Sequence, residues 1–127
     1  MGETPEEIGL ITDLQWRIEV NGFMAMVEFL RNSTQSMKKR ALAGTYDYEQ
    51  IPALAEREKL RVQRFLKGVD QMVDDKAYLT AENFSVADID LLVLVEFAGW
   101  RKLALPSTSK NALRWYQQIR ERSSAKL

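Results

Sequence analysis

The segment from Asn83 to Trp100, NFSVADIDLLVLVEFAGW, constrains the fold more than any other part of the chain. Between Ile89 and Trp100 its only charged residues are Asp90 and Glu96, so a helix here has almost no polar face. Because a helix that is apolar on all sides must be surrounded, we expect this one to be the central helix of a bundle. It is too short and too interrupted to cross a bilayer, which takes about 20 apolar residues.

Two local devices predict where this helix begins. Ser85 and Asp88 form a capping-box pattern, in which each side chain satisfies a free backbone N–H of the first turn. Phe84 and Ile89 have the spacing of a hydrophobic staple. We expect the helix body to run from Ile89 to about Leu103.

The first helix begins at Thr4, which can cap it, with Pro5 at the first helical position and Glu7 completing a capping box. One apolar stripe has helical spacing and contains Ile11, Leu14, Ile18, Gly22, Ala25 and Phe29. A second stripe contains Val20, Phe23, Val27 and Leu30, with Met24 and Met26 between. The second half of this helix therefore either contacts a further surface or lies deep in the bundle. Gly22 marks a bend or a close approach.

The connector from Asn32 to Gln50 is longer than most loops, so we expect an extra turn or a helix extension within it. Asp47 and Gln50 have capping spacing, and Pro52 lies near the start of a second helix that we expect to end at about Met72. Its core-facing residues are Leu54, Val62, Phe65, Leu66, Val69 and Met72 or Val73.

A basic stripe runs along the other side of this second helix and contains Arg57, Arg61, Arg64 and Lys67, with Glu56 and Glu58 beside it. It is either a phosphate-binding face or a solvated face with ion pairs. Lys plus Arg and Asp plus Glu number 18 each, and this balance favours the solvated face.

Pro106 is expected to stop the central helix. A last helix follows from about Ser109 to Arg122, with Leu113, Tyr116 and Ile119 facing inward. No segment alternates with period two, so the prediction is an all-α fold, a bundle of four to five helices in a single domain over residues 1–127.

Composition excludes several kinds of chemistry. The chain has no Cys and no His, which removes disulfides, thiolate catalysis, Ser-His pairs and the usual zinc sites. We expect no metal and no catalytic residue in this chain. The first ten residues, MGETPEEIGL, lack the pattern of a signal peptide. The balanced charge predicts neither a nucleic-acid nor a membrane partner. The absence of Cys is compatible with a reducing compartment, and we expect a cytoplasmic protein.

YLTAENFSVADIDLLVLVEFAGW, followed by ALRWYQQIRER, resembles the C-terminal domain of the glutathione transferase family. That family has Phe-Ser/Thr-x-Ala-Asp-Ile opening a buried helix, and a last helix with Leu-x-x-Trp/Tyr and Ile-x-x-Arg. The matching residues are Tyr78, Leu79, Phe84, Ser85, Ala87, Asp88, Ile89, Leu113, Trp115, Tyr116, Ile119 and Arg122. The order and lengths of the first two helices also fit, so the resemblance covers essentially the whole chain.

Two residues depart from the family pattern. Ala81-Glu82 stands where the family usually has Gly-Asp, and because Ala adopts positive φ only at a cost, we expect a different turn. Ser123 replaces a frequent Pro.

The resemblance implies a division of labour between two domains. In this family glutathione, the co-substrate, binds a thioredoxin-like N-terminal domain, which this chain lacks. The helical domain lines the apolar pocket for the electrophile and contributes to dimerisation. We therefore expect the full-length protein to conjugate glutathione to an electrophile in detoxification, and the isolated chain to be inactive. Met1-Gly2 directly before a capping box indicates a truncated start, and the expected partner is a second copy or the missing domain.

By the same resemblance, the substrate-binding residues are Phe23 and Met26 on the first helix and Phe97 and Trp100 on the central one. Aromatic and thioether groups suit an apolar co-substrate. The alternative is that all four are ordinary core. If they line a pocket, Met26 and Trp100 should be partly exposed on one apolar patch.

The sequence leaves two other functions open. Similar helical domains assemble complexes in elongation factors and aminoacyl-tRNA synthetases, so this chain could be a stand-alone interaction module. The reading frame upstream of Met1 would distinguish that module from an enzyme domain. Nucleic-acid binding through Lys38-Lys39-Arg40 and the basic stripe is the weakest reading, because the charge is balanced.

Overall fold

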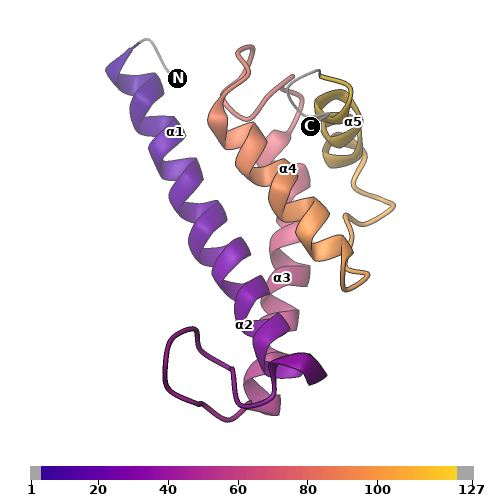
Figure 1. Cartoon of the computed structure of the whole chain (residues 1–127). Coiled ribbons are helices and arrows are strands. Elements are labelled where there is room, and N and C mark those ends of the chain that lie inside the picture. The colour runs from indigo at the N-terminus through magenta and orange to yellow at the C-terminus, as the bar shows by residue number, and fades with distance from the viewer. Residues whose placement is uncertain (1–3, 123–127) are drawn as a thin grey trace.

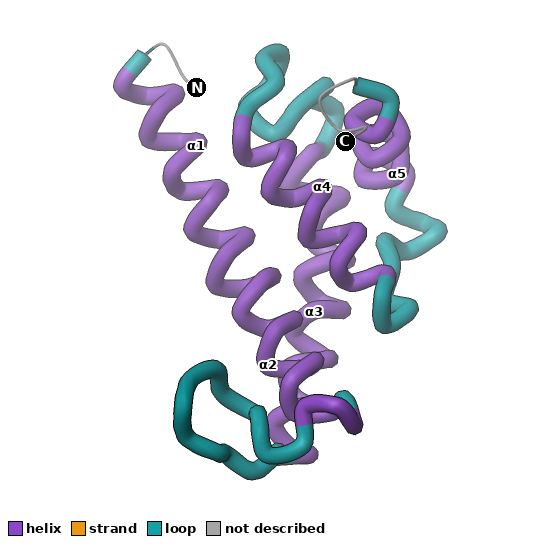
Figure 2. The backbone as a smooth tube through the Cα atoms, in the orientation of Figure 1, coloured by secondary structure: helices purple, strands orange, loops and turns teal. Residues whose placement is uncertain are grey.

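A computed structural model describes residues 4–122 of the chain. The helices are α1 (Pro5–Ile18), η1 (Glu19–Phe23), α2 (Met24–Ser33), η2 (Gln35–Met37), α3 (Pro52–Val73), α4 (Val86–Gly99) and α5 (Lys110–Arg120). Within the described residues there are two isolated β-bridges and no strand (Figure 2). The all-α prediction is confirmed. The Met1–Gly2 start and Ser123 lie outside the described residues.

The first long helix has an irregular turn at its centre. Residues Glu19–Phe23 form a π-helix, η1, that joins α1 to α2 without a loop (Figure 1). Gly22 lies in this turn and is buried, and a Cβ added to it would clash with Leu94 and lie 3.3 Å from Phe65 Cε1. Of the two alternatives stated for Gly22, the structure therefore supports the close approach, and this explains why a glycine occupies the middle of a helix.

The bundle is built from pairwise helix contacts. α3 packs along α2 and against α5, while α4 packs against α1 and α5. Figure 1 shows α1 and α4 lying in front of α3, with α5 beside them. Seven of the 14 residues of α4 are buried, but its apolar residues Ile89 and Val93 are exposed, as is Trp100 directly after the helix. These three are spaced at i, i+4 and i+11, so they lie on one side of the helix. The prediction that α4 is surrounded therefore holds for all but this outer face of α4.

The predicted start of α4 is largely confirmed. Ser85 and Asp88 form the capping box, in which the Ser85 backbone N–H donates to Asp88 Oδ2 at 3.0 Å. The Phe84 ring lies against Tyr78, with ring centroids 5.8 Å apart, and 39% of Ile89 is exposed. The staple between Phe84 and Ile89 stays a prediction.

The predicted end of α4 is wrong. The helix ends at Gly99, well before Leu103 and Pro106. Lys102 has a φ of 63°, and the Leu103 N–H donates back to the Ala98 carbonyl at 3.1 Å. This is the pattern of a Schellman cap, in which a left-handed residue closes the helix by itself. Sequence reasoning missed it because the left-handed position holds Lys rather than the usual Gly.

α3 agrees with its predicted span, and Val62, Leu66, Val69 and Val73 form its buried face. The connector before it contains the short helix η2, in line with the expected extra turn. The predicted Asp47–Gln50 cap is wrong, because the N-cap is Ile51 without a side-chain bond. Gln50 Nε2 donates to the carbonyls of Arg31 and Thr34 at the end of α2 instead.

Two further expectations are corrected. On α5, Leu113 is exposed and Tyr116 is only half-buried, and the inward residues are Ala112, Trp115 and Ile119. The large Trp115 side chain is fully buried and faces the core. Leu113 lies two positions earlier, so it is on a different face of the helix. In the turn before α4, Ala81 does take a positive φ, 106°, despite its side chain. Hydrogen bonds in both directions between the backbones of Tyr78 and Ala81 hold it there.

Candidate functional site

The end of α4 carries an exposed pair of aromatic side chains. The rings of Phe97 and Trp100 pack edge to face, with centroids 5.1 Å apart and an interplanar angle of 80°. Trp100 is 75% exposed, while Phe97 is half-buried against the core. The large indole is therefore held in place by Phe97 and still offers most of its surface for binding.

Arg101 fixes the position of this pair relative to α2. Its Nη1 donates to Ser33 Oγ at 2.8 Å and to Thr34 Oγ1 at 3.0 Å. Its guanidinium also lies 4.6 Å from the centroid of the Phe29 ring, a cation–π contact. These bonds join the residue directly after Trp100 to the end of α2.

The two predicted residues on the first helix have different environments. Phe23, at the end of η1, is half-buried and packs against the same core as Phe97. Met26 has an exposed fraction of 0%, so the expectation that it shares an exposed patch with Trp100 is wrong. Met26 and its neighbour Ala25 are both buried on α2, the helix that packs along α3. The structure thus brings Phe97 and Trp100 together and places Met26 inside.

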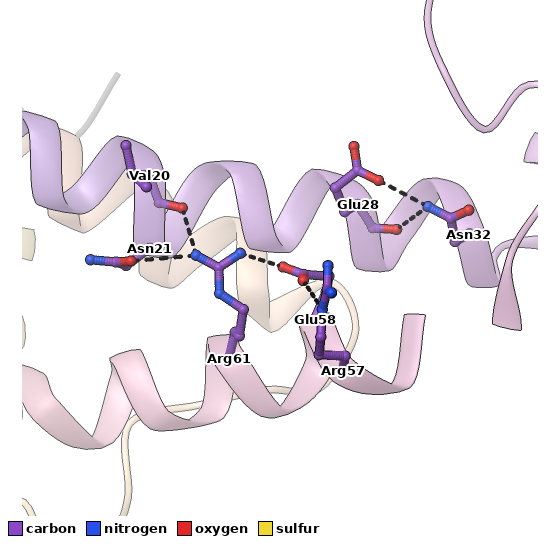
Figure 3. Close-up of polar contacts among 7 residues, drawn as sticks. All are labelled: Val20, Asn21, Glu28, Asn32, Arg57, Glu58 and Arg61. Carbon is purple, nitrogen blue, oxygen red and sulfur yellow. Dashed lines mark hydrogen bonds and ion pairs between the residues drawn. The ribbon is translucent and has the colours of Figure 1, made fainter. Parts of the chain in front are cut away.

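A buried carboxylate lies within the basic stripe, which sequence reasoning placed in solvent. Glu58 is 1% exposed and faces the bundle. Its Oε2 accepts from Arg61 Nη1 at 2.7 Å and its Oε1 from Arg57 Nε at 2.8 Å (Figure 3). The prediction of a solvated face is therefore wrong for Glu58. Two arginines compensate its charge, as a buried carboxylate requires.

Arg61 also connects α3 to the irregular turn. Its Nη2 donates to the Val20 carbonyl at 3.2 Å and to Asn21 Oδ1 at 3.3 Å (Figure 3). A π-turn disturbs the regular i→i−4 bonds, and it often occurs at functional sites. The sequence offers two signals for this arrangement. They are Gly22 in the middle of a predicted helix and the basic stripe on the next helix.

A surface cavity of about 360 Å³ adjoins Arg61. Its lining residues come from η1 and α3, and they are Asn21, Arg61, Arg64, Phe65, Gly68 and Met72. It combines two cationic side chains with an apolar floor. Within residues 4–122, no group of three or more His, Cys, Asp or Glu side chains is arranged to hold a metal ion. No helix in the same range is both long and apolar enough to cross a membrane.

The chain is similar to glutathione transferases in both sequence and structure. It is 23% identical over 125 residues to "Glutathione S-transferase 2" of Saccharomyces cerevisiae, covering 98% of this chain and 52% of that protein. The crystal structure of Gtt2 from the same yeast matches with a TM-score of 0.85 and 23% identity, covering 98% of this chain and 58% of the other.

Two bacterial structures agree. A glutathione S-transferase domain-containing protein of Marinobacter aquaeolei VT8 gives a TM-score of 0.84 at 21% identity, covering 98% of this chain and 58% of the other. A glutathione S-transferase of class Gtt2 from Vibrio parahaemolyticus gives 0.77 at 21% identity, covering 98% and 54%. No protein-family model matches the chain.

These comparisons define the fold. The chain has the helical fold found in glutathione S-transferase structures, and the resemblance predicted from its sequence is confirmed. It spans about half the length of the relatives that it matches.

Proposed function

We propose that this chain is the helical domain of a glutathione transferase-like protein. In that protein a thioredoxin-like domain outside this chain would bind glutathione, and the complete enzyme would conjugate glutathione to an electrophile. The observation that carries the proposal is the match to Gtt2 over 98% of this chain with a TM-score of 0.85. A cytoplasmic location and a role in detoxification belong to the same proposal.

Within this protein, Phe97 and Trp100 would form one wall of the electrophile pocket. An exposed indole supported by a phenyl ring offers a flat, polarizable surface to an aromatic electrophile. Phe23, half-buried at the end of η1, is proposed as a further lining residue on the family resemblance alone. Met26 is fully buried, so it would contribute to the core and would not contact the electrophile directly.

The exposed apolar side chains support a role in association. Trp16 on α1 is 66% exposed, and Met24 and Val27 on α2 are also exposed. Together with the outer face of α4 they give the chain large exposed apolar side chains on three helices, α1, α2 and α4. We propose that the missing domain or a second copy covers some of them.

Calorimetry and a conjugation assay test this proposal. The isolated chain should neither bind glutathione at millimolar concentration nor conjugate it to 1-chloro-2,4-dinitrobenzene. A fusion of this chain behind the N-terminal part of the yeast relative, the part that this chain does not match, should conjugate glutathione to 1-chloro-2,4-dinitrobenzene. The Trp100→Ala variant of that fusion should raise KM for the electrophile and leave KM for glutathione unchanged. Saturable glutathione binding by the isolated chain would contradict the proposal.

A further inference from the structure

The connector between α2 and α3 forms a loop whose two ends are fixed, and it stands out beside the end of the bundle (Figure 2). The Ala41 N–H donates to the Tyr48 carbonyl at 3.2 Å, and the Tyr48 N–H donates to the Lys39 carbonyl at 2.9 Å. Gln50 Nε2 donates to the Arg31 carbonyl on α2 at 2.9 Å. Residues 42–47, the tip of this loop, are therefore presented on a closed neck, as in compact surface loops that often carry function.

The tip exposes apolar side chains that the core does not use. Every residue of the tip is exposed, and Leu42 and Tyr46 are 48% and 76% exposed. Neither side chain packs against the core cluster of the bundle. Between Ala41 and Tyr48, no backbone N–H bonds to another described residue. The tip thus offers apolar groups and free backbone donors to a surface outside the chain.

Four cations lie next to the tip. Lys38, Lys39 and Arg40 precede it directly and are exposed. Arg31 on α2 donates from Nη1 to the Arg40 carbonyl at 2.8 Å, and these two arginines line a surface cavity of about 410 Å³ together with the tip. Within residues 4–122, no carboxylate lies at ion-pair distance from any of the four. The net charge of zero, from which we expected no membrane partner, therefore hides a local group of unpaired cations.

We propose that this loop docks the chain reversibly on an anionic lipid surface. The four cations attract the phosphate and carboxylate groups of the lipids, and Leu42 and Tyr46 enter the headgroup layer, where apolar and aromatic side chains are favourable. Each Lys or Arg near such a surface strengthens binding about fivefold. The exposed carboxylates of Asp47 and Glu49 oppose this attraction, so the binding is weak and sensitive to salt.

The composition of the tip favours lipid over nucleic acid. Single-stranded nucleic acids bind through cations and through aromatic rings on which the bases stack. Leu42 has no such role, whereas an aliphatic side chain beside a tyrosine suits the boundary of a bilayer. The loop contains no residue of the Phe97–Trp100 pair, so this inference does not rest on the transferase assignment.

Cosedimentation with lipid vesicles tests the proposal. The chain is mixed with vesicles of pure phosphatidylcholine and with vesicles that also contain phosphatidylserine. We expect binding to the anionic vesicles to be stronger by about tenfold or more, and to be lost at high salt. The soluble headgroup glycerophosphoserine and a short single-stranded RNA are titrated in parallel, and both should bind more weakly than the vesicles. Tighter binding of either one, or equal binding to both kinds of vesicle, would overturn the proposal.

A matched pair of double variants separates local charge from net charge. Lys38→Gln combined with Lys39→Gln should weaken binding to the anionic vesicles about twentyfold, since two cations are removed at the contact. Lys59→Gln combined with Lys67→Gln removes the same charge from exposed positions on α3 and should weaken binding by about twofold at most. Equal losses in the two double variants would show that only net charge matters and would overturn the proposal.

Two single variants and a spectrum locate the contact at the tip. Leu42→Ser should weaken vesicle binding about fivefold, because it removes an apolar group from the headgroup layer. Asp47→Asn should strengthen binding about fivefold, because it removes a repelling charge. In bicelles with spin-labelled headgroups, the amide signals of residues 42–47 should broaden most. Unchanged binding by both variants, or strongest broadening around Trp16 or Trp100, would overturn the proposal and leave the transferase assignment untouched.

Discussion

The indole of Trp115 donates from Nε1 to Asp88 Oδ1 at 2.9 Å in the interior of the bundle. Both residues have an exposed fraction of 0%. The same carboxylate oxygen accepts from the Leu79 backbone N–H at 3.0 Å, and Oδ2 accepts from Ser85 N at 3.0 Å. One carboxylate therefore joins the turn before α4, the first turn of α4 and the middle of α5.

Asp88→Ala should lower the free energy of unfolding by about 3 kcal/mol or more, because it leaves three buried donors without an acceptor and each costs about 1–3 kcal/mol. A simple exposed helix cap would cost only about 1 kcal/mol. Asp88→Asn keeps one acceptor oxygen, so its free energy of unfolding should lie between those of the parent and of Asp88→Ala. Urea denaturation measures all three proteins. A loss below about 1 kcal/mol for Asp88→Ala would show that this network contributes little.

Gly22→Ala should destabilise the chain by about 1–3 kcal/mol, because the added methyl group meets Leu94 and Phe65 in a packed core. Gly9→Ala is the matched control on the same long helix. Nothing lies within 4 Å of its added Cβ, so it should stabilise the helix by up to about 1 kcal/mol. Thermal unfolding of both variants measures these two changes in stability. Equal effects would mean that η1 relaxes to accept the methyl group.

Ala81→Gly should stabilise the chain by about 1 kcal/mol. Ala81 has a φ of 106°, a strained conformation for a residue with a Cβ and an easy one for glycine. Ala77→Gly in the same loop lacks this strain and should be destabilising, because glycine has more freedom in the unfolded chain. If both variants melt at lower temperature than the parent, the Ala81 backbone carries no strain.

Tyr116 should titrate above its usual pKa of 10.0, since partial burial raises the pKa and its hydrogen bond to Glu96 raises it further, against the opposing effect of Arg120. A raised pKa in the folded chain means that this contribution to stability is present below pH 10 and is lost as the pH rises through the folded-state pKa. Ultraviolet absorbance measures phenolate formation.

The difference between the parent and Tyr116→Phe isolates this one tyrosine. Glu96→Gln keeps a hydrogen-bond acceptor but removes the charge, so it should lower the pKa of Tyr116. A difference curve with its midpoint at or below pH 10.0 would contradict the assigned environment.

Local sequence signals predicted the start of α4 and the burial on α1 and α3, because caps and apolar spacing act over a few residues. The end of α4 was missed because Lys102 takes a left-handed conformation that sequence assigns to glycine. The burial of Glu58 was not predicted, since the sequence shows it only as one carboxylate among the charged residues of α3, and the pairing with Arg57 and Arg61 that compensates it appears only in the structure. Tertiary contacts alone decided that Met26 points inward and Trp100 outward.

The claim that the end of α4 is an electrophile wall can be tested through the indole N–H signals of the three tryptophans. The isolated chain is titrated with 1-chloro-2,4-dinitrobenzene in ¹H–¹⁵N spectra. Trp115 is buried and bonded to Asp88, and Trp16 is exposed on α1, so they serve as internal controls. We predict a saturable shift of the Trp100 signal, with the signals of Trp115 and Trp16 unchanged. Equal, non-saturating shifts of Trp16 and Trp100, or no shift of Trp100, would contradict it.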